Sequence, residues 1–280
     1  MTTVSVMSDL HLEFADIELP GGDILLLPGD VFLAASLAHD VTGGYLFAAR
    51  QRAVRFAEEE LKKYKHVIHT NGNHEHYHSC LQDSPTFVTR FLKKHAPHAT
   101  HLHNKAIDIE GVRFIGSTLW ATYGYGTPAA DRIERDMNDC ALIKVWSESA
   151  AGYHIAKPKD FHTQHLRAVS YIRKELAKAK ETDTPCVLVT HHAPSYLSAA
   201  EGGRRTGGAL ADAYYSNQHA LIEENPHLKA WYHGHTHDSC HYRIGEALIA
   251  SNQRGYYPQE YAACNFNPNA EDFELDELKK

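Results

Sequence analysis

The 280-residue sequence lacks any apolar run long enough to cross a membrane. Its first residues, MTTVSVMSDLHLEF, lack the basic segment and the apolar stretch that together mark a secretory leader. Five cysteines are scattered along the chain, and none of them forms a Cys-x-x-Cys pair. This spacing favours reduced thiols over a disulfide framework. We therefore expect a soluble protein of the cytoplasm that has no membrane partner.

The sequence also has no excess of positive charge. Its 28 lysines and arginines are outnumbered by 35 aspartates and glutamates, and the net charge is −7 with neutral histidines. Proteins that grip long nucleic acids usually carry a basic face, so a small molecule or a nucleotide is favoured as substrate over long nucleic acid. The sequence contains no Gly-x-Ser-x-Gly motif that would indicate a serine nucleophile.

No internal repeat, low-complexity tract or clear linker divides the chain. A chain of this length with 43% hydrophobic residues can bury a large core without disulfides. We expect one α/β domain over residues 1–280.

Hydrophobic patterning predicts strands that alternate with helices. Apolar runs typical of strands lie at 3–8, 23–30, 66–70, 99–120, 186–194 and 228–237, and a hairpin is predicted at 240–252. Helices are predicted at 45–64, 84–95, 131–146 and 160–180. The buried stripe of the last helix is predicted to consist of Leu166, Val169, Ile172 and Leu176.

Polar residues of one chemical kind follow the apolar strands. They are Asp9 and His11, Asp30, Asn73 and His74, His191 and His192, and His235 and His237. Ligands of open α/β sheets bind beyond the carboxyl ends of the strands, so we expect these side chains to gather at one place. Gly29, Gly72 and Gly234 stand where the backbone has to turn sharply beside a cation.

The chemistry of this set predicts a metal centre. Carboxylates and imidazoles suit Mn, Fe, Zn or Ni, and no cysteine in the set demands a softer metal. One metal rarely uses seven protein ligands of this mixture, whereas two metals that share a bridging carboxylate do. We therefore expect two divalent transition metal ions as cofactors.

The order Asp-x-His, Gly-Asp, Gly-Asn-His-Glu, His and Gly-His-x-His resembles the calcineurin-like metallophosphoesterase superfamily. These motifs extend from Asp9 to His237 and cover most of the chain. The stretches SDLHLEF, GSTLW and NQRGY further resemble a bacterial and phage subgroup. The resemblance implies an α/β (α+β) fold of two packed mixed β-sheets flanked by helices. It also implies hydrolysis of a phosphate mono- or diester.

The resemblance assigns roles motif by motif. It implies that the first metal is held by Asp9, His11 and His237, and the second by Asn73, His191 and His235. Asp30 would bridge the two metals, and His74 would be a catalytic group rather than a ligand. A metal-bound hydroxide would attack phosphorus, and His74 would stabilise the developing charge or protonate the leaving oxygen.

Three further histidines have more than one interpretation. His192 is either a neighbour of the metal ligands or a substrate-facing group, and it replaces His191 as the ligand if the strand register shifts by one. His76 and His78 match no motif position. Exposed loop histidines are the favoured interpretation of both, and a substrate contact is the alternative.

Three arginines are candidates for binding phosphate, because a guanidinium matches phosphate in bidentate fashion. Arg254, in NQRGY, is predicted to bind substrate. Arg204 and Arg205 lie in the glycine-rich stretch EGGRRTGG. For these two a solvated surface charge is slightly favoured over a phosphate clamp.

Two other functions remain as alternatives. The stretch HEHYHS is similar to the His-x-His-x-Asp-His of metallo-β-lactamase-type hydrolases, but His78 stands where that motif needs aspartate and Ser79 where it needs histidine. A non-catalytic module of the same fold is the other alternative. Degenerate modules lose ligands, whereas this chain keeps every motif position, His74 included.

Overall fold

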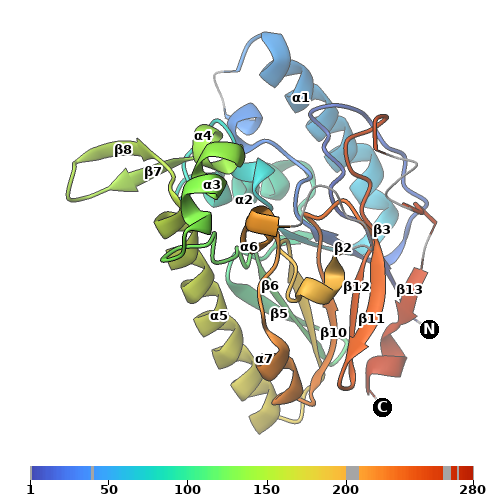
Figure 1. Ribbon diagram of the computed structural model, residues 1–280. Coiled ribbons are helices and arrows are strands. Elements are labelled where there is room, and N and C mark those ends of the chain that lie inside the picture. Colours follow the sequence, from blue (N-terminus) through green and yellow to red (C-terminus); the bar gives the residue numbers. More distant parts are fainter. Residues whose placement is uncertain (1, 39–40, 200–207, 261–265, 270, 280) are drawn as a thin grey trace.

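A computed structural model describes residues 2–38, 41–199, 208–260, 266–269 and 271–279. Two β-sheets pack face to face, and helices cover their outer faces (Figure 1). The predicted α/β fold of two packed mixed sheets flanked by helices is confirmed. Arg204 and Arg205 lie outside the described residues, as does Cys264.

The first sheet has five strands in the order β13-β1-β2-β3-β4. Their bounds are Glu271–Glu274, Thr3–Val6, Gly22–Pro28, Tyr64–Thr70 and Ala99–His101. Strands β1 to β4 run parallel, and β13 pairs with β1 in the antiparallel direction. The carboxyl ends of β1, β2 and β3 therefore lie at one edge of this sheet.

The second sheet has six strands in the order β11-β12-β10-β9-β6-β5. Their bounds are Cys240–Ile244, Ala247–Ser251, Leu228–Tyr232, Cys186–Thr190, Val112–Ser117 and Lys105–Ile109. The four central strands are parallel, and the edge strands β11 and β5 are antiparallel to their neighbours. The predicted strands and the predicted hairpin are confirmed.

The apolar strands are buried on both faces, as their continuous hydrophobic runs predict. Ile24 and Leu26 of β2 belong to the core between the two sheets, where they join Val187 and Val189 of β9. Leu25 and Leu27 of β2 point to the opposite face and pack in the core under α1 and α2. This alternation follows from the two-residue period of a strand.

Helices cover the outer face of each sheet. The five-stranded sheet is covered by α1 (Gly44–Arg55) and α2 (Ser84–His95), and the six-stranded sheet by α5 (Pro158–Glu181) and α7 (His219–Glu223). The predicted helix at 45–64 consists of α1, a π turn (Phe56–Glu60) and a 3-10 turn (Leu61–Lys63).

The segment between β6 and β9 differs from the prediction of one helix at 131–146. It contains α3 (Ala129–Asp136), α4 (Asp139–Leu142) and the antiparallel hairpin of β7 (Lys144–Ser147) and β8 (Gly152–Ile155). The hairpin extends away from the body of the molecule (Figure 1). Only Val145 of β7 is buried, so this strand has little of the hydrophobic alternation by which strands are recognised.

The predicted buried stripe of α5 is wrong at Leu166, whose side chain is 56% exposed. The buried face instead contains Phe161, His165, Ala168 and Ile172. His165 occupies a buried position because its Nδ1 lies 3.1 Å from the carbonyl oxygen of Leu119, to which it can donate a hydrogen bond. A polar residue on the buried face conceals the true stripe in the sequence.

This register predicts different stabilities for two leucine variants of α5. Leu176→Ala should lower the free energy of unfolding by about 2–5 kcal/mol, because it opens a cavity in the core. Leu166→Ala should change it by about 0.5 kcal/mol or less, because the side chain is exposed. Urea denaturation of both variants measures the difference, and equal losses would contradict the register.

Candidate metal centre

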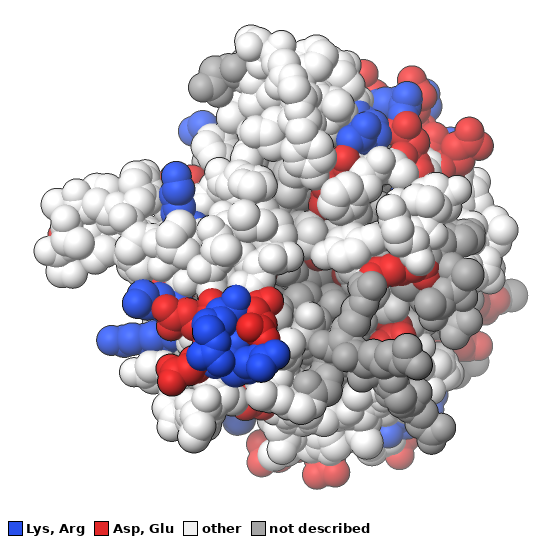
Figure 2. All heavy atoms as spheres, turned by 45° about the horizontal axis from the view of Figure 1, so that its top comes forward, with Lys and Arg blue, Asp and Glu red and all other residues white. Residues whose placement is uncertain are grey.

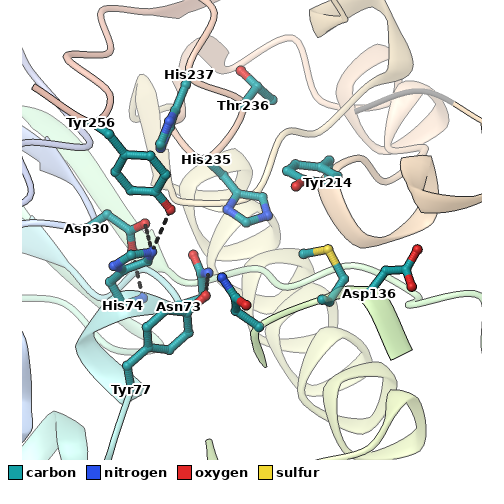
Figure 3. A pocket seen from close by; sticks show the side chains of 12 residues that line it. Asp30, Asn73, His74, Tyr77, Asp136, Tyr214, His235, Thr236, His237 and Tyr256 are labelled. Atoms are coloured by element: carbon teal, nitrogen blue, oxygen red, sulfur yellow. Dashed lines mark hydrogen bonds and ion pairs between the residues drawn. The ribbon is translucent and has the colours of Figure 1, made fainter. Parts of the chain in front are cut away.

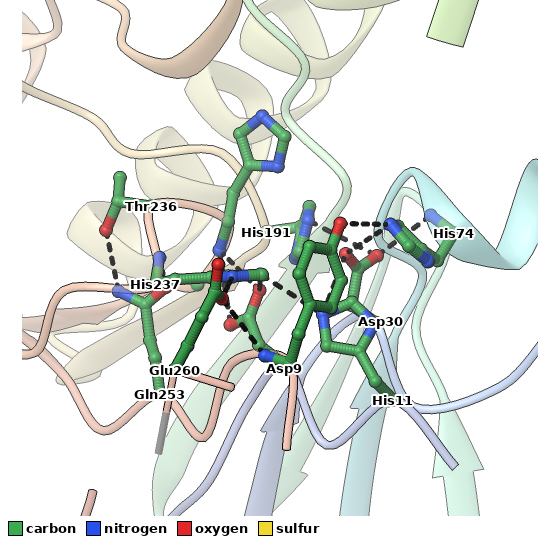
Figure 4. A network of polar contacts seen from close by, with 12 residues as sticks. Asp9, His11, Asp30, His74, His191, Thr236, His237, Gln253 and Glu260 are labelled. Carbon is green, nitrogen blue, oxygen red and sulfur yellow. Dashed lines mark hydrogen bonds and ion pairs between the residues drawn. The ribbon is translucent and has the colours of Figure 1, made fainter. Parts of the chain in front are cut away.

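The predicted site residues come from five strand ends of the two sheets. Asp9 and His11 follow β1, and Asp30 follows β2. Asn73 and His74 follow β3, while His191 follows β9 and His235 and His237 follow β10. Figure 4 shows Asp9, His11, Asp30, His74, His191 and His237 converging from both sheets. The structure thus brings the candidate ligands together although they are spread from residue 9 to residue 237.

Five of the candidate ligands have left-handed backbone conformations. Their φ angles are 53° at Asp9, 45° at His11, 55° at Asp30, 74° at His235 and 55° at His237. Non-glycine residues rarely adopt positive φ, and such strain gathers at functional sites. Here it directs successive polar side chains off the strand ends into one cluster.

Glycines permit very close backbone approaches beside the carboxylates. A Cβ at Gly72 would lie 2.1 Å from Oδ1 of Asp30, and one at Gly234 would lie 2.5 Å from Oδ2 of Asp9. Neither distance is possible for a real side chain. The close approach of the backbone to a carboxylate therefore requires glycine at both positions. Glycine also suits position 29, where φ is 86°.

The first group of donor atoms belongs to Asp9, His11, Asp30 and His237, all within 4.8 Å of one another. Nε2 of His11 lies 3.1 Å from Nε2 of His237. Nε2 of His237 lies 3.4 Å from Oδ1 of Asp9, and Nε2 of His11 lies 3.9 Å from Oδ2 of Asp30.

The hydrogen bonds of this first group leave bare lone pairs in its middle. Nδ1 of His11 faces Oε1 of Glu13 at 3.2 Å, and Nδ1 of His237 faces Oε2 of Glu260 at 2.6 Å. A carboxylate accepts hydrogen bonds, so each Nδ1 carries the ring proton and each Nε2 presents a lone pair. Two lone pairs 3.1 Å apart repel unless a cation lies between them. The residues present therefore fit a metal ion.

The second group of donor atoms belongs to Asp30, His191 and His235. Nδ1 of His191 donates to the carbonyl oxygen of Pro28 at 2.8 Å, so Nε2 is the ring atom that is available to a cation. This Nε2 lies 2.8 Å from Oδ1 of Asn73 and 3.4 Å from Oδ1 of Asp30. Burial lowers the pKa of His191, but the charge and hydrogen bond of Asp30 outweigh it and raise the pKa to about 9. Without a metal, a proton on this Nε2 therefore holds the three atoms together, and a cation could take its place.

Burial and neighbouring charge set the protonation of these groups. Burial raises the pKa of Asp9, but the neighbouring His237 and His191 outweigh it and bring the pKa to about 2. Burial also opposes ionisation of Asp30, yet His191 and His74 hold its pKa well below the usual range. Burial and His191 lower the pKa of His235 to about 3. Two carboxylates and a neutral imidazole are thus present at neutral pH, as metal ligation requires.

His74 lies beside the first group and lines the cavity above both groups (Figure 3). Its Nδ1 lies 2.8 Å from Oε1 of Glu13, and its Nε2 lies 3.2 Å from the hydroxyl of Tyr256. Burial lowers the pKa of His74, but the charge of Asp30 and the hydrogen bond to Glu13 outweigh it and raise the pKa to about 9.

Glu13, His11 and His74 bring a third set of donor atoms together. Oε1 of Glu13 accepts from Nδ1 of both rings, at 3.2 Å and 2.8 Å. These donors and this acceptor satisfy one another without a cation. Glu13 therefore fits the role of a buried carboxylate that orients two histidines.

Sequence reasoning missed several residues that support the site. Besides Glu13 they include Glu260, Tyr256 and Glu75, whose buried carboxylate accepts from the backbone N–H groups of Asp30 at 3.0 Å and Gly72 at 2.6 Å. Glu75 is the last residue of the Gly-Asn-His-Glu motif and Glu13 lies two positions after His11, and that proximity was a usable signal. Glu260 contacts His237 from a separate loop, and no local pattern marks it.

The three ambiguous histidines take different places. His192 is buried, its ring centroid lies 4.1 Å from that of His235, and Nε2 lies 3.2 Å from the hydroxyl of Tyr123. It is not among the residues that line the described cavity. The prediction of an exposed His76 is wrong, because this side chain is fully buried against Trp120. His78 is exposed, as predicted.

The contacts of Arg254 favour a structural role over substrate binding. Its guanidinium is buried and donates to the backbone carbonyls of Leu10 at 3.1 Å and Asp16 at 2.7 Å. It also lies 4.6 Å from the ring centre of Tyr257. Arg254 thereby ties the loop after β1, which carries His11 and Glu13, to the loop after β12.

The cavity over the two groups is walled by aromatic and polar side chains. Tyr77, Tyr214 and Tyr256 line it, together with Asp136 at the end of α3 (Figure 3). Tyr214 stacks on His235 with ring centroids 4.7 Å apart.

Among the described residues, no helix is both long and apolar enough to span a membrane.

Comparison with solved structures shows a known fold. A phosphopantetheinyl hydrolase from Mycobacterium tuberculosis aligns over 94% of this chain and 92% of its own, with a TM-score of 0.59 and 15% identity. A putative 5'-nucleotidase from Staphylococcus aureus aligns over 90% of this chain and 49% of its own, with a TM-score of 0.50 and 15% identity. At these identities the likeness concerns the fold alone.

Comparison of sequences shows the family. An uncharacterized protein, L509, from Acanthamoeba polyphaga mimivirus is 25% identical in an alignment that covers 99% of this chain and 98% of that protein. The sequence profile of the calcineurin-like phosphoesterases matches residues 2–239, a span that includes every motif from Asp9 to His237. The chain therefore belongs to the calcineurin-like phosphoesterase family.

Proposed function

We propose that this protein is a phosphoric ester hydrolase, a phosphatase or phosphodiesterase, that depends on two divalent transition metal ions. The observation that carries the proposal is the position of Asp30. Its Oδ1 faces His191 at 3.4 Å in one donor group, and its Oδ2 faces His11 at 3.9 Å in the other. Asp30 is the one residue shared by these two groups among the described residues.

The two donor groups assign the ligands of the proposed centre. One ion would be held by Asp9, His11, His237 and Asp30, and the other by Asn73, His191, His235 and Asp30. When bound, such ions supply a hydroxide nucleophile from coordinated water and neutralise charge on phosphoryl oxygens. The mixture of imidazole and carboxylate suits Mn, Fe, Zn or Ni.

His74 is the proposed catalytic residue. Its Nδ1–H is held by Glu13, so Nε2 is the atom that faces the cavity and can donate a proton to a leaving oxygen or a phosphoryl oxygen. The hydroxyl of Tyr256 lies 3.2 Å from this Nε2 and can share that proton. Figure 3 shows His74 and Tyr256 beside Asp30, the residue that the two donor groups share.

The surface supports a small phosphate ester or a nucleotide as substrate. On the face shown in Figure 2, described lysines and arginines form small clusters mixed with aspartates and glutamates rather than a continuous basic surface. Long nucleic acids need such a surface to bind their phosphates. We further propose that residues 1–280 form one domain, because both sheets share one core.

Metal content tests the centre itself. Protein purified without chelator should contain close to two transition metal ions per chain by elemental analysis, because two converging donor groups are present. Manganese should restore the ions after they are removed. A content near zero that manganese cannot restore would contradict the proposal.

Turnover separates the enzyme from a non-catalytic module of the same fold. Hydrolysis of a chromogenic phosphate ester should require added metal and should stop with chelator. Profiling across phosphomonoesters, cyclic nucleotides and short oligonucleotides would then identify the preferred ester class. Tight metal binding without turnover of any of these esters would favour the non-catalytic module.

A further inference from the structure

Asn73 can serve as a metal ligand only through its amide oxygen, because its NH₂ group carries no available lone pair. In the structure Oδ1 of Asn73 lies 2.8 Å from Nε2 of His191, on the side of the second donor group. The opposite orientation of the amide would place NH₂ there. That NH₂ could donate to Nε2 of a neutral His191, the form that binds metal, so the neutral ring does not by itself select the orientation in which Asn73 can ligate.

We infer that Asp139 is a positioning residue that fixes the amide of Asn73 with its oxygen toward the second metal site; this inference rests on the two-metal function proposed above. Nδ2 of Asn73 donates to Oδ1 of Asp139 at 2.8 Å and to the hydroxyl of Tyr77 at 3.0 Å. The carboxylate also accepts from the hydroxyls of Tyr77 and Tyr123, so all of its hydrogen bonds have Asp139 as the acceptor. Flipping the amide would set two oxygens against each other.

Asp139 is itself held in place by buried donors. Its side chain is fully buried at the start of α4. The hydroxyl of Tyr77 donates to Oδ1 at 2.9 Å, and the hydroxyl of Tyr123 donates to Oδ2 at 2.7 Å. A buried carboxylate with three donors is well satisfied and rigid. The segment between β6 and β9, which contains no metal motif, thereby controls a ligand 66 residues away.

Asp139→Asn tests the inference. A carboxamide has the same shape as a carboxylate, but it carries both a donor and an acceptor and can therefore bond with Asn73 in either orientation. Titration calorimetry of the metal-free protein with Mn²⁺ would measure the number of sites and the affinity of each. We expect affinity at one site to fall about 10–100-fold, the range typical of lost partners behind a ligand, while the other site is unchanged.

Asp131→Asn is the matched control. It removes the same charge from the same segment, but Asp131 is exposed in the first turn of α3 and is not among the residues that line the described cavity. Both sites should keep their wild-type affinity in this variant. The thermal midpoint of each metal-free variant would show that it folds.

Three results would overturn the inference. Wild-type affinity at both sites in Asp139→Asn would show that the carboxylate does not select the orientation. Equal losses at both sites together with a lowered thermal midpoint would show a structural role instead. Fewer than two sites in the wild-type protein would overturn the two-metal proposal and this inference with it. That result is distinguishable from a failure of the inference alone, because it is seen in the wild-type protein and needs no variant.

Discussion

Asp30→Asn should lose at least one metal ion and nearly all hydrolysis while the protein folds normally. The carboxylate can bridge two cations roughly 3.5–4 Å apart because both oxygens offer lone pairs and its charge offsets their repulsion. Asn has nearly the same size but no charge, and its NH₂ end cannot ligate. Each carboxylate oxygen of Asp30 belongs to one of the two donor groups, so replacing either oxygen with NH₂ removes an acceptor atom from one group.

Local structure explains why the fold should survive this change. Asp30 has a φ of 55°, a conformation that asparagine tolerates better than most residues. Its Oδ1 accepts from the backbone N–H of His74 at 2.9 Å, and the amide oxygen of asparagine can accept the same bond. The thermal midpoint should therefore stay close to that of the wild-type protein without metal.

His11→Ala is the comparison variant for Asp30→Asn. It removes one neutral ligand from one donor group, so its loss of metal and of rate should be smaller. Elemental analysis and initial rates on both variants decide the question. If Asp30→Asn kept two ions and substantial activity, Asp30 would not bridge, and the two-metal proposal would fail at its centre.

His74→Ala should keep both ions and lose turnover by roughly 10²–10⁴-fold, the range typical of a general acid or base. Nδ1 of His74 is occupied by Glu13, and its Nε2 faces the hydroxyl of Tyr256 in the cavity. The variant thus removes a proton donor while both donor groups around Asp30 keep their atoms.

His78→Ala is the control for the same loop. This histidine is exposed, so its removal should leave metal content and rate unchanged. Metal analysis should accompany the rates of both variants. A loss of metal in parallel with activity in His74→Ala would show that His74 is a ligand, and its assignment as the catalytic group would be wrong.

Burial of loop histidines could not be predicted from the local sequence. His76 and His78 lie two positions apart in one polar stretch, yet one is fully buried and the other exposed. His76 is buried because Trp120, from the segment after β6, covers it. The same reason explains Leu166, which fits a helical stripe but faces solvent because the six-stranded sheet contacts a neighbouring face of α5.

The sequence by itself determined the fold class and the candidate ligands. Each ligand type stands within a few residues of a buried apolar strand, as Asp30 does after DILLLPG, and parallel strands bring their carboxyl ends to one edge. The hydrophobicity of each strand and the order of the motifs can both be read directly from the sequence.

Only the tertiary structure decided which groups orient those ligands. Glu260 contacts His237 from 23 residues away, and Asp139 contacts Asn73 from 66 residues away. Which ring nitrogen carries the proton, and which amide atom faces the metal site, depends on these distant partners. No local pattern encodes them, because hydrogen bonds between separate loops depend on where the packed sheets place those loops.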